Sequence, residues 1–138
     1  VGSRWLKEYL VNFSRNFIYS TALETHNLLS VKHTYFYLQS NINQLFSLFN
    51  LNKYFKFKAN DLKSSFEVRG DGPIYGIIVP DNKKCKDLAV YLQNHNLDVR
   101  AILSPTVPKG TERLRVILHS FNTTAEIDQL FSLLTDYK

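Results

Sequence analysis

Residues 75–135 alternate between short apolar runs and amphipathic segments, and this order restricts the chain to few folds. The runs at 75–80, 98–103 and 113–118 are typical of strands, because they are short, apolar and bounded by turn-forming residues. Between and after them, apolar residues recur at spacings of three and four, as on the buried face of a helix. The resulting order of strand, helix, strand, loop, strand and helix predicts a small α/β sandwich. The loop at 104–112 is tight enough to join an antiparallel pair.

Capping patterns mark where the helices of this region begin. Asp81 stands before the first amphipathic segment, and Asn94-His95-Asn96 should end it. The buried residues of that helix are predicted to be Cys85, Leu88, Ala89 and Leu92. Thr123 with Glu126 three residues later is a capping-box pattern, which predicts the start of a last helix. The buried face of this last helix is predicted to consist of Ile127, Leu130, Phe131 and Leu134.

The first half of the chain is expected to be organised differently from the second. Residues 1–50 are predicted to be a helical lead-in, and residues 51–138 an α/β domain. An apolar stripe predicts a helix over 3–14, whereas the short run Phe17-Ile18-Tyr19 fits only a brief strand or an extended link. Residues 51–74 are the least regular part of the sequence.

A long helix is predicted from Thr21 to about Asn50. Thr21 and Glu24 form a capping-box pattern, and no proline or glycine interrupts the stretch. Its apolar residues recur at alternating spacings of three and four, and they predict one buried seam of Tyr35, Leu38, Ile42, Leu45 and Phe49. A helix of this length usually spans a domain or bridges two layers.

The composition is that of an ordinary globular protein with room for one hydrophobic core. No apolar run approaches the ~20 residues of a membrane helix, so no membrane partner is expected. The single cysteine, Cys85, excludes an internal disulfide and fits a reducing cytoplasm, and its place on an apolar helix face predicts a core residue. The four histidines lie at no metal-ligand spacing, so no metal is expected. A net charge of +5 could attract nucleic acid or a phosphorylated cofactor, but nothing matches an RNA-binding signature, and no nucleic-acid partner is expected.

The strand predicted at 113–118 carries the most informative candidate residue. Its even-numbered residues are apolar and should face the core, so that Arg113 and Arg115 should point to the opposite face. An arginine fixed on a strand presents a planar fork suited to a carboxylate or a phosphate. A solvated arginine, or one paired with Glu112 or Asp128, is the alternative.

Two further candidates lie where backbone groups are held in place. Thr106 sits in a loop braced by Pro105 and Pro108, which suits a ligand contact, although a simple turn remains the alternative. Ser20 and Thr21 would offer hydroxyl and backbone donors to an anion if a helix begins there, or Thr21 would merely cap it. The sequence contains no Gly-rich phosphate loop, nucleophile elbow or paired catalytic carboxylates in a recognisable context.

The run from Ser104 to Val116, SPTVPKGTERLRV, resembles the PPTVPxGTxRLR signature of the 8-amino-7-oxononanoate synthases. Upstream, Gly2-Ser3-Arg4 and the run FIYSTAL at 17–23 resemble GSR…FIFSTAL of the same family, and residues 123–130 are similar to its final helix. The resemblance covers nearly the whole chain and is weakest at 50–70. It implies the C-terminal third of a pyridoxal-phosphate-dependent α-oxoamine synthase with fold-type I architecture, here a long helix followed by a small domain with an antiparallel or mixed sheet.

The resemblance also implies an activity. Members of this family act as homodimers and condense alanine with pimeloyl-CoA, or its carrier-protein thioester, with loss of carbon dioxide in biotin biosynthesis. The lysine that binds pyridoxal phosphate in the family lies upstream of Val1, and no lysine here stands in a similar motif. The isolated chain is therefore expected to be inactive, to contain no catalytic residue and to bind no cofactor.

A few residue roles follow from the same resemblance. Arg115 matches the arginine that binds the substrate carboxylate, and Thr106 matches a substrate-contacting threonine. Ser20 and Thr21 match the pair that reaches the cofactor phosphate of the other subunit. Leu103 stands where the family often has arginine, which puts one polar contact to the acyl group in doubt.

Two other interpretations remain open at this stage. The chain could be part of 2-amino-3-ketobutyrate CoA ligase or of another α-oxoamine synthase, because these enzymes share the carboxylate arginine. A stand-alone, non-catalytic α/β ligand-binding module also fits the length.

Overall fold

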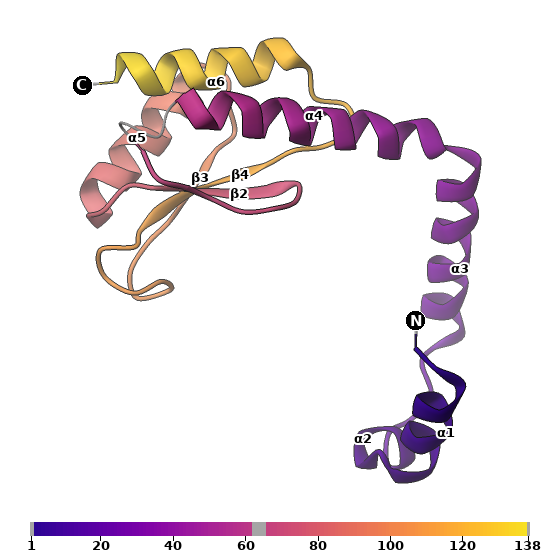
Figure 1. The fold of residues 1–138 in the computed structure, drawn as a ribbon. Helices are drawn as coiled ribbons and strands as arrows, with labels where there is room; N and C mark the ends of the chain where they lie inside the picture. Colours follow the sequence, from indigo (N-terminus) through magenta and orange to yellow (C-terminus); the bar gives the residue numbers. More distant parts are fainter. Residues whose placement is uncertain (1, 62–65, 138) are drawn as a thin grey trace. The chain divides into compact units, whose positions relative to one another are not determined.

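The computed structural model describes residues 2–61 and 66–137, and the chain divides into two compact units, residues 1–40 and 41–138 (Figure 1). The first unit contains α1 (Arg4–Phe13), α2 (Arg15–Ile18) and α3 (Thr25–Ser40). None of its described residues is buried. Most of its apolar side chains, Trp5 and Phe13 among them, are exposed.

Two predictions for this unit were wrong and one is confirmed. Helix α1 matches the predicted helix and is capped by Ser3, whose hydroxyl accepts the Leu6 N–H at 3.2 Å. Residues 17–19 form no strand, because Phe17 and Ile18 belong to the single turn of α2. No helix begins at Thr21: α3 starts four residues later at Thr25, since the residues after Ile18 are used in closing α2.

The predicted long helix is also interrupted. Helix α3 ends at Ser40, and α4 (Ile42–Asp61) begins after Asn41, whose carbonyl accepts the Gln44 N–H at 3.0 Å. Asparagine favours helix starts over helix interiors because its side chain competes for backbone hydrogen bonds. Helix α4 then runs through residue 50 and occupies the first part of the stretch expected to be least regular, up to Asp61. The division into a lead-in and a domain at residue 50 stays a prediction.

The apolar seam expected on the long helix is not buried. Of its five residues only Leu38 is half-buried, and Phe49 is 55% exposed. A different face of α4, one turn further along, packs in the core through Leu51, Phe55 and Ala59. The helical period was therefore right, but the buried face was misassigned.

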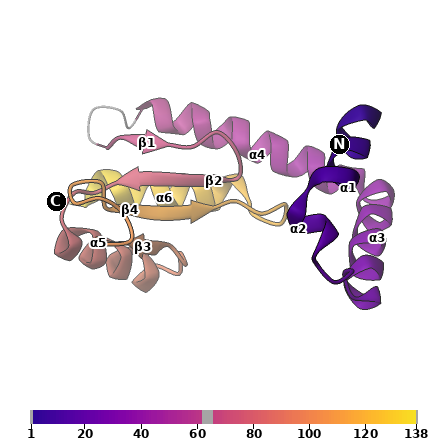
Figure 2. The ribbon, with the colours of Figure 1, turned by 90° about the horizontal axis from the view of Figure 1, so that it is seen from below.

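The second unit contains a four-stranded sheet in the order β1-β2-β4-β3. Its elements after α4 are β1 (Val68–Arg69), β2 (Ile74–Ile78), α5 (Asn82–Asn94), β3 (Arg100–Ile102), β4 (Arg113–Ile117) and α6 (Thr124–Asp136). Every pair of neighbouring strands is antiparallel, so the sheet is antiparallel rather than mixed. Helix α5 connects β2 to β3, which lie on either side of β4 (Figure 2).

The capping patterns of this unit are confirmed. The Asp81 carboxylate accepts the N–H groups of Lys83 and Lys84 at 2.8 and 3.0 Å, and α5 follows. At α6, the Thr123 hydroxyl accepts the Glu126 N–H at 3.2 Å, and the Glu126 carboxylate accepts the Thr123 N–H at 2.7 Å. Both helices bury the faces predicted for them.

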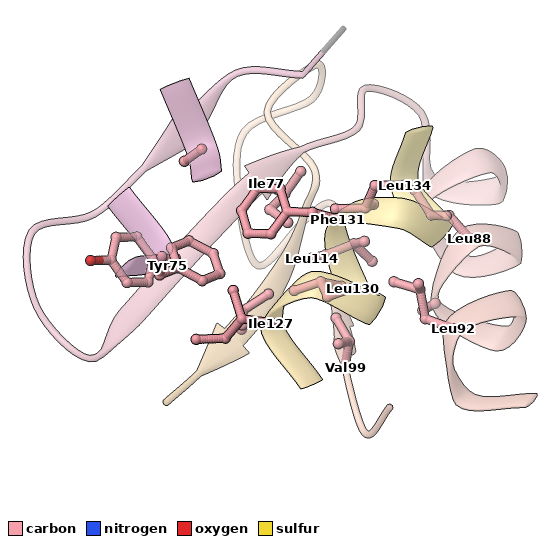
Figure 3. Packing of buried hydrophobic residues seen from close by; sticks show 14 of the residues in the cluster. Tyr75, Ile77, Leu88, Leu92, Val99, Leu114, Ile127, Leu130, Phe131 and Leu134 are labelled. Atoms are coloured by element: carbon pink, nitrogen blue, oxygen red, sulfur yellow. The ribbon is translucent and has the colours of Figure 1, made fainter. Parts of the chain in front are cut away.

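The core lies between one face of the sheet and helices α4, α5 and α6 (Figure 3). Phe55 on α4 is completely buried, and its ring stacks on Tyr75 of β2 at 4.2 Å between centroids. It also meets Phe131 of α6 edge-on at 5.1 Å. Cys85 is completely buried as well, and burial raises the pKa of its thiol, as expected for a core residue.

Phe55→Ala should destabilise the chain by about 3–5 kcal/mol, because it removes a buried ring and leaves a cavity between helix and sheet. Phe57→Ala is the matched control on the same helix, since Phe57 is 64% exposed. That change should alter stability by no more than about 0.5 kcal/mol. Urea denaturation of both variants, followed by circular dichroism, measures the difference. Equal losses would contradict the packing described here.

Candidate functional site

Strand β4 divides its side chains between two faces as its sequence predicts. Leu114 and Val116 are buried in the core, whereas Arg115 and Ile117 are exposed on the opposite, outer face. Arg113 is half-buried on that outer face. The strand therefore presents two arginines on the same side, one pleat apart, and their surroundings differ.

Arg113 is held by the protein itself. Its Nε donates to the main-chain carbonyl of Thr111 at 3.0 Å. Its stem passes over Gly76 of β2, since a Cβ placed on Gly76 would lie 3.0 Å from the Arg113 Cδ. Neither acidic partner proposed for these arginines is used: Asp128 accepts hydrogen bonds from Lys58 and Tyr54, both at 2.7 Å.

Arg115 is the arginine left available for an external group. Its neighbours in the sheet are Gly76 on β2 and Arg100 on β3. Arg100 is paired with Asp98 at 2.7 Å, which balances its charge. Within the described parts of the chain, no side-chain hydrogen bond or ion pair of Arg115 is found. Such an exposed guanidinium fork can bind a carboxylate through two parallel hydrogen bonds.

A pocket of about 460 Å³ lies beside Arg115. The segment before β3, the end of β4 and the first turns of α6 line it, and its polar lining includes Arg100, Arg115, His119, Asn122 and Glu126. The pocket mixes cationic and acidic groups with apolar ones.

Thr106 lies exposed in the loop that joins β3 to β4. Main-chain hydrogen bonds shape this loop, from Val107 N–H to the Leu103 carbonyl at 3.2 Å and from Thr111 N–H to the Pro108 carbonyl at 3.0 Å. Thr106 and Arg115 thus belong to the same unit, with the loop entering β4 at Arg113. Their roles as substrate contacts stay predictions.

Glu112 is a residue at this site that sequence reasoning missed. It is only 1% exposed, and its Oε2 accepts the N–H groups of Gly110 at 2.9 Å and Asp81 at 3.1 Å. Its own N–H and those of Asp81 and Gly110 lower the pKa of its carboxyl below the usual value, although burial opposes this. The signal was present in the sequence: Glu112 continues the alternation of Leu114 and Val116, which face the core.

Ser20 and Thr21 lie in the first unit, exposed, between α2 and α3. They do not stand at a helix N-terminus, contrary to the prediction, because α3 begins only at Thr25. The Ser20 hydroxyl donates to the main-chain carbonyl of Asn16. Their role as cofactor-binding residues stays a prediction.

Two further features are absent from residues 2–61 and 66–137. No helix there is long and apolar enough to cross a membrane. In the same residues, no three histidine, cysteine, aspartate or glutamate side chains are grouped so that they could hold a metal ion.

The two arginines of β4 should differ in how fast their Nε–H groups exchange with solvent. The exchange rate of the Arg113 Nε–H should be lower than that of the Arg115 Nε–H by a factor of about five or more. This factor corresponds to a net hydrogen-bond free energy of about 1 kcal/mol. Arginine-selective NMR on the labelled chain measures both rates. Gly76→Ala should speed exchange at Arg113 alone, because the added Cβ displaces its stem. Equal rates in the unmodified chain would contradict the distinction.

Comparisons with known proteins place the chain in a group of synthases. No protein-family profile matches the chain. The 8-amino-7-oxononanoate synthase of Emericella nidulans is 36% identical over 141 residues, which cover 95% of this chain and 33% of that protein. The enzyme of Aeromonas salmonicida is 31% identical over 134 residues, covering 96% of this chain and 33% of that protein. The chain thus spans about a third of the length of the curated relatives it matches.

Solved structures agree with this similarity. The crystal structure of 8-amino-7-oxononanoate synthase from Francisella tularensis matches with a TM-score of 0.70 and 25% identity, over 97% of this chain and 39% of that one. Serine palmitoyltransferase from Sphingomonas wittichii shares the fold, with a TM-score of 0.70 and 16% identity over 99% of this chain and 34% of that one. The chain is therefore similar to the C-terminal part of the 8-amino-7-oxononanoate synthases and has the corresponding fold of fold-type I enzymes.

Proposed function

We propose that this chain, a relative of the 8-amino-7-oxononanoate synthases over their C-terminal part, is the substrate-facing portion of a pyridoxal-phosphate-dependent acyltransferase. That enzyme condenses alanine with pimeloyl-CoA, or its carrier-protein thioester, with decarboxylation in biotin biosynthesis. The observation that carries the proposal is the exposed Arg115 on β4, the strand that follows the loop PTVPKGT. An amino-acid substrate offers the carboxylate that this guanidinium lacks within the described chain.

Arg115 and Thr106 have separate parts in this proposal. Arg115 binds the carboxylate of alanine and fixes the orientation of the amino acid. Thr106, exposed between two prolines, contacts the substrate from a loop whose backbone is held in place. Leu103 is half-buried and offers no charge to the acyl chain, so the polar end of a pimeloyl group must be bound by other residues.

The residues present fit pyridoxal phosphate in part. Ser20 and Thr21 expose two hydroxyls that can donate to phosphate oxygens, Ser20 after release of the Asn16 carbonyl. The cofactor supplies the electron sink for the chemistry at the amino-acid carbon when it is bound. In this proposal its lysine comes from a part of the enzyme that these residues do not include, and Ser20 and Thr21 serve the site of the partner subunit in a cytoplasmic homodimer.

Another α-oxoamine synthase is the second candidate, because the serine palmitoyltransferases share the fold over nearly the whole chain. The amino-acid substrate distinguishes the candidates. The complete enzyme should turn over alanine in preference to serine and glycine. Faster turnover of serine or glycine would favour the second candidate.

Arg115→Lys in the complete enzyme should weaken alanine binding by about 10- to 150-fold, the range for a hydrogen-bonded charged pair. Lysine retains the charge but loses the planar fork that grips a carboxylate. Cofactor binding should not change. Titration with alanine, followed by cofactor absorbance, measures the effect. Arg113→Lys is the control, and equally small effects at both positions would mean that Arg115 is a surface arginine.

The isolated chain of 138 residues should not bind pyridoxal phosphate covalently at one lysine, because none of its lysines stands in the required context. It should also fail to turn over alanine with a thioester. Incubation with pyridoxal phosphate, borohydride reduction and intact-mass measurement test the first point. A single stoichiometric adduct on one lysine would refute it.

A further inference from the structure

Glu112 is the one charged residue that is buried among those whose burial the structure describes. A buried carboxylate is costly unless its oxygens are satisfied. None of the ion pairs within residues 2–61 and 66–137 involves Glu112. Its oxygen accepts two main-chain N–H groups instead, at 2.9 Å from Gly110 and 3.1 Å from Asp81. The charge of Glu112 is therefore used to hold backbone.

These two hydrogen bonds join separate parts of the chain. Gly110 lies near the end of the β3–β4 loop, with φ of 87°, and Asp81 lies at the start of α5, with φ of 92°. Neither N–H takes part in the sheet, so both would lack a protein partner without this carboxylate. The main chain of Glu112 adds a third tie, since its carbonyl accepts the Val79 N–H at 2.8 Å. One residue thus fixes the end of the loop to the beginning of the helix.

The beginning of the loop is fixed to the same place. The Asn82 amide oxygen accepts the Ser104 N–H at 2.9 Å, and the Asn82 amide nitrogen donates to the Ser104 carbonyl at 3.3 Å. Asn82 is the first residue of α5 and follows Asp81 directly. Both ends of the loop are therefore bound to neighbouring residues at the start of one helix, and Thr106 lies between the two ties.

We propose that Glu112 and Asn82 are positioning residues, which hold the β3–β4 loop in one conformation so that Thr106 is placed to meet the substrate. The proposal rests on the proposed function where it assigns a substrate to Thr106. Neither residue is free to touch that substrate: the Glu112 carboxylate is buried, and both polar atoms of the Asn82 amide are bound to Ser104. Because the two residues already hold the loop in one conformation, the loop loses less conformational freedom when the substrate binds.

The order of the loop is tested on the chain itself, by amide hydrogen exchange with NMR detection. Glu112→Gln should speed exchange at Gly110 and Asp81 by roughly ten-fold, because hydrogen bonds to the charged carboxylate are lost or weakened. Asn82→Ala should likewise speed exchange of the Ser104 amide. Because Asn82 is exposed, this variant should fold even if Glu112→Gln does not. The amides of Leu130 and Phe131 in α6 should keep their rates, which shows an intact core. Unchanged exchange at all three loop and cap amides would overturn the proposal.

Glu67→Gln is the matched control for these experiments. Glu67 is exposed, and its carboxylate accepts a hydrogen bond from Arg69 at 2.6 Å rather than from the loop or the start of α5. The same change from carboxylate to amide there should leave exchange at Gly110, Asp81 and Ser104 unaltered. Faster exchange in this variant would mean that loss of any carboxylate loosens the chain.

The link to Thr106 is tested by a double-mutant cycle in the complete enzyme. Glu112→Gln alone should raise KM for the thioester or alanine by roughly ten-fold with little change in kcat. The reason is that the loop would no longer hold Thr106 in position for the substrate. In a Thr106→Val background the same substitution should have little further effect, because the two residues act through one contact. Fully additive losses would overturn the role assigned to Glu112.

The cycle also separates this inference from the proposed function. If Thr106→Val and Arg115→Lys both leave KM unchanged, the proposed substrate contacts are wrong and Glu112 positions nothing for them. If these two variants raise KM but Glu112→Gln and Asn82→Ala do not, the proposed function stands and the positioning role is refuted.

Discussion

The aromatic contact of Phe55 with Tyr75 and Phe131 decides how the second unit is layered. It attaches α4 to a strand and to the last helix at one point, with the Phe55 ring removed from water completely. Helix α4 must then keep the face of Leu51, Phe55 and Ala59 against the sheet. Since α5 and α6 bury their own faces in the same core, all three helices cover one side of the sheet. The outer side is where the described chain presents Arg113 and Arg115.

On the outer face of the sheet, the glycine at position 76 gives Arg113 and Arg115 different surroundings. Gly76 leaves a space on β2 that the stem of Arg113 occupies, and the Nε of Arg113 then reaches the Thr111 carbonyl. Arg115 lies opposite the same glycine in the sheet and has no such contact within the described residues. One arginine is thus part of the frame around the loop, and the other can bind a partner from outside.

The sequence predicted residues 75–135 well because local signals and tertiary packing agree there. The caps at Asp81 and Thr123, the four buried residues of each following helix and the alternation of β4 all appear as expected. Each of these patterns is read from residues only a few positions apart, which is where periodicity is informative.

Elsewhere the local signals were insufficient. Thr21 and Glu24 have the spacing of a capping box, but α2 uses the residues just before them, and spacing alone does not reveal this competition. The seam from Tyr35 to Phe49 has a correct helical period, yet a period does not say which face finds a partner. Glu112 was missed for a different reason: a charged residue in a loop signature is normally taken as exposed, although its parity with Leu114 places it inward.

The sheet topology makes one loop and one helix dependent on each other. Strands β2 and β3 lie on either side of β4, and both end opposite Arg113. The start of α5 and the β3–β4 loop therefore meet at the same end of these strands. Surface loops usually tolerate insertions, since each added residue costs little closure entropy. In this loop an extra residue between Ser104 and Gly110 would leave both ties intact, since each tie lies next to a strand end, but it would move Thr106 relative to them. The two ties therefore fix where the loop begins and ends, and the number of residues between them decides where Thr106 stands.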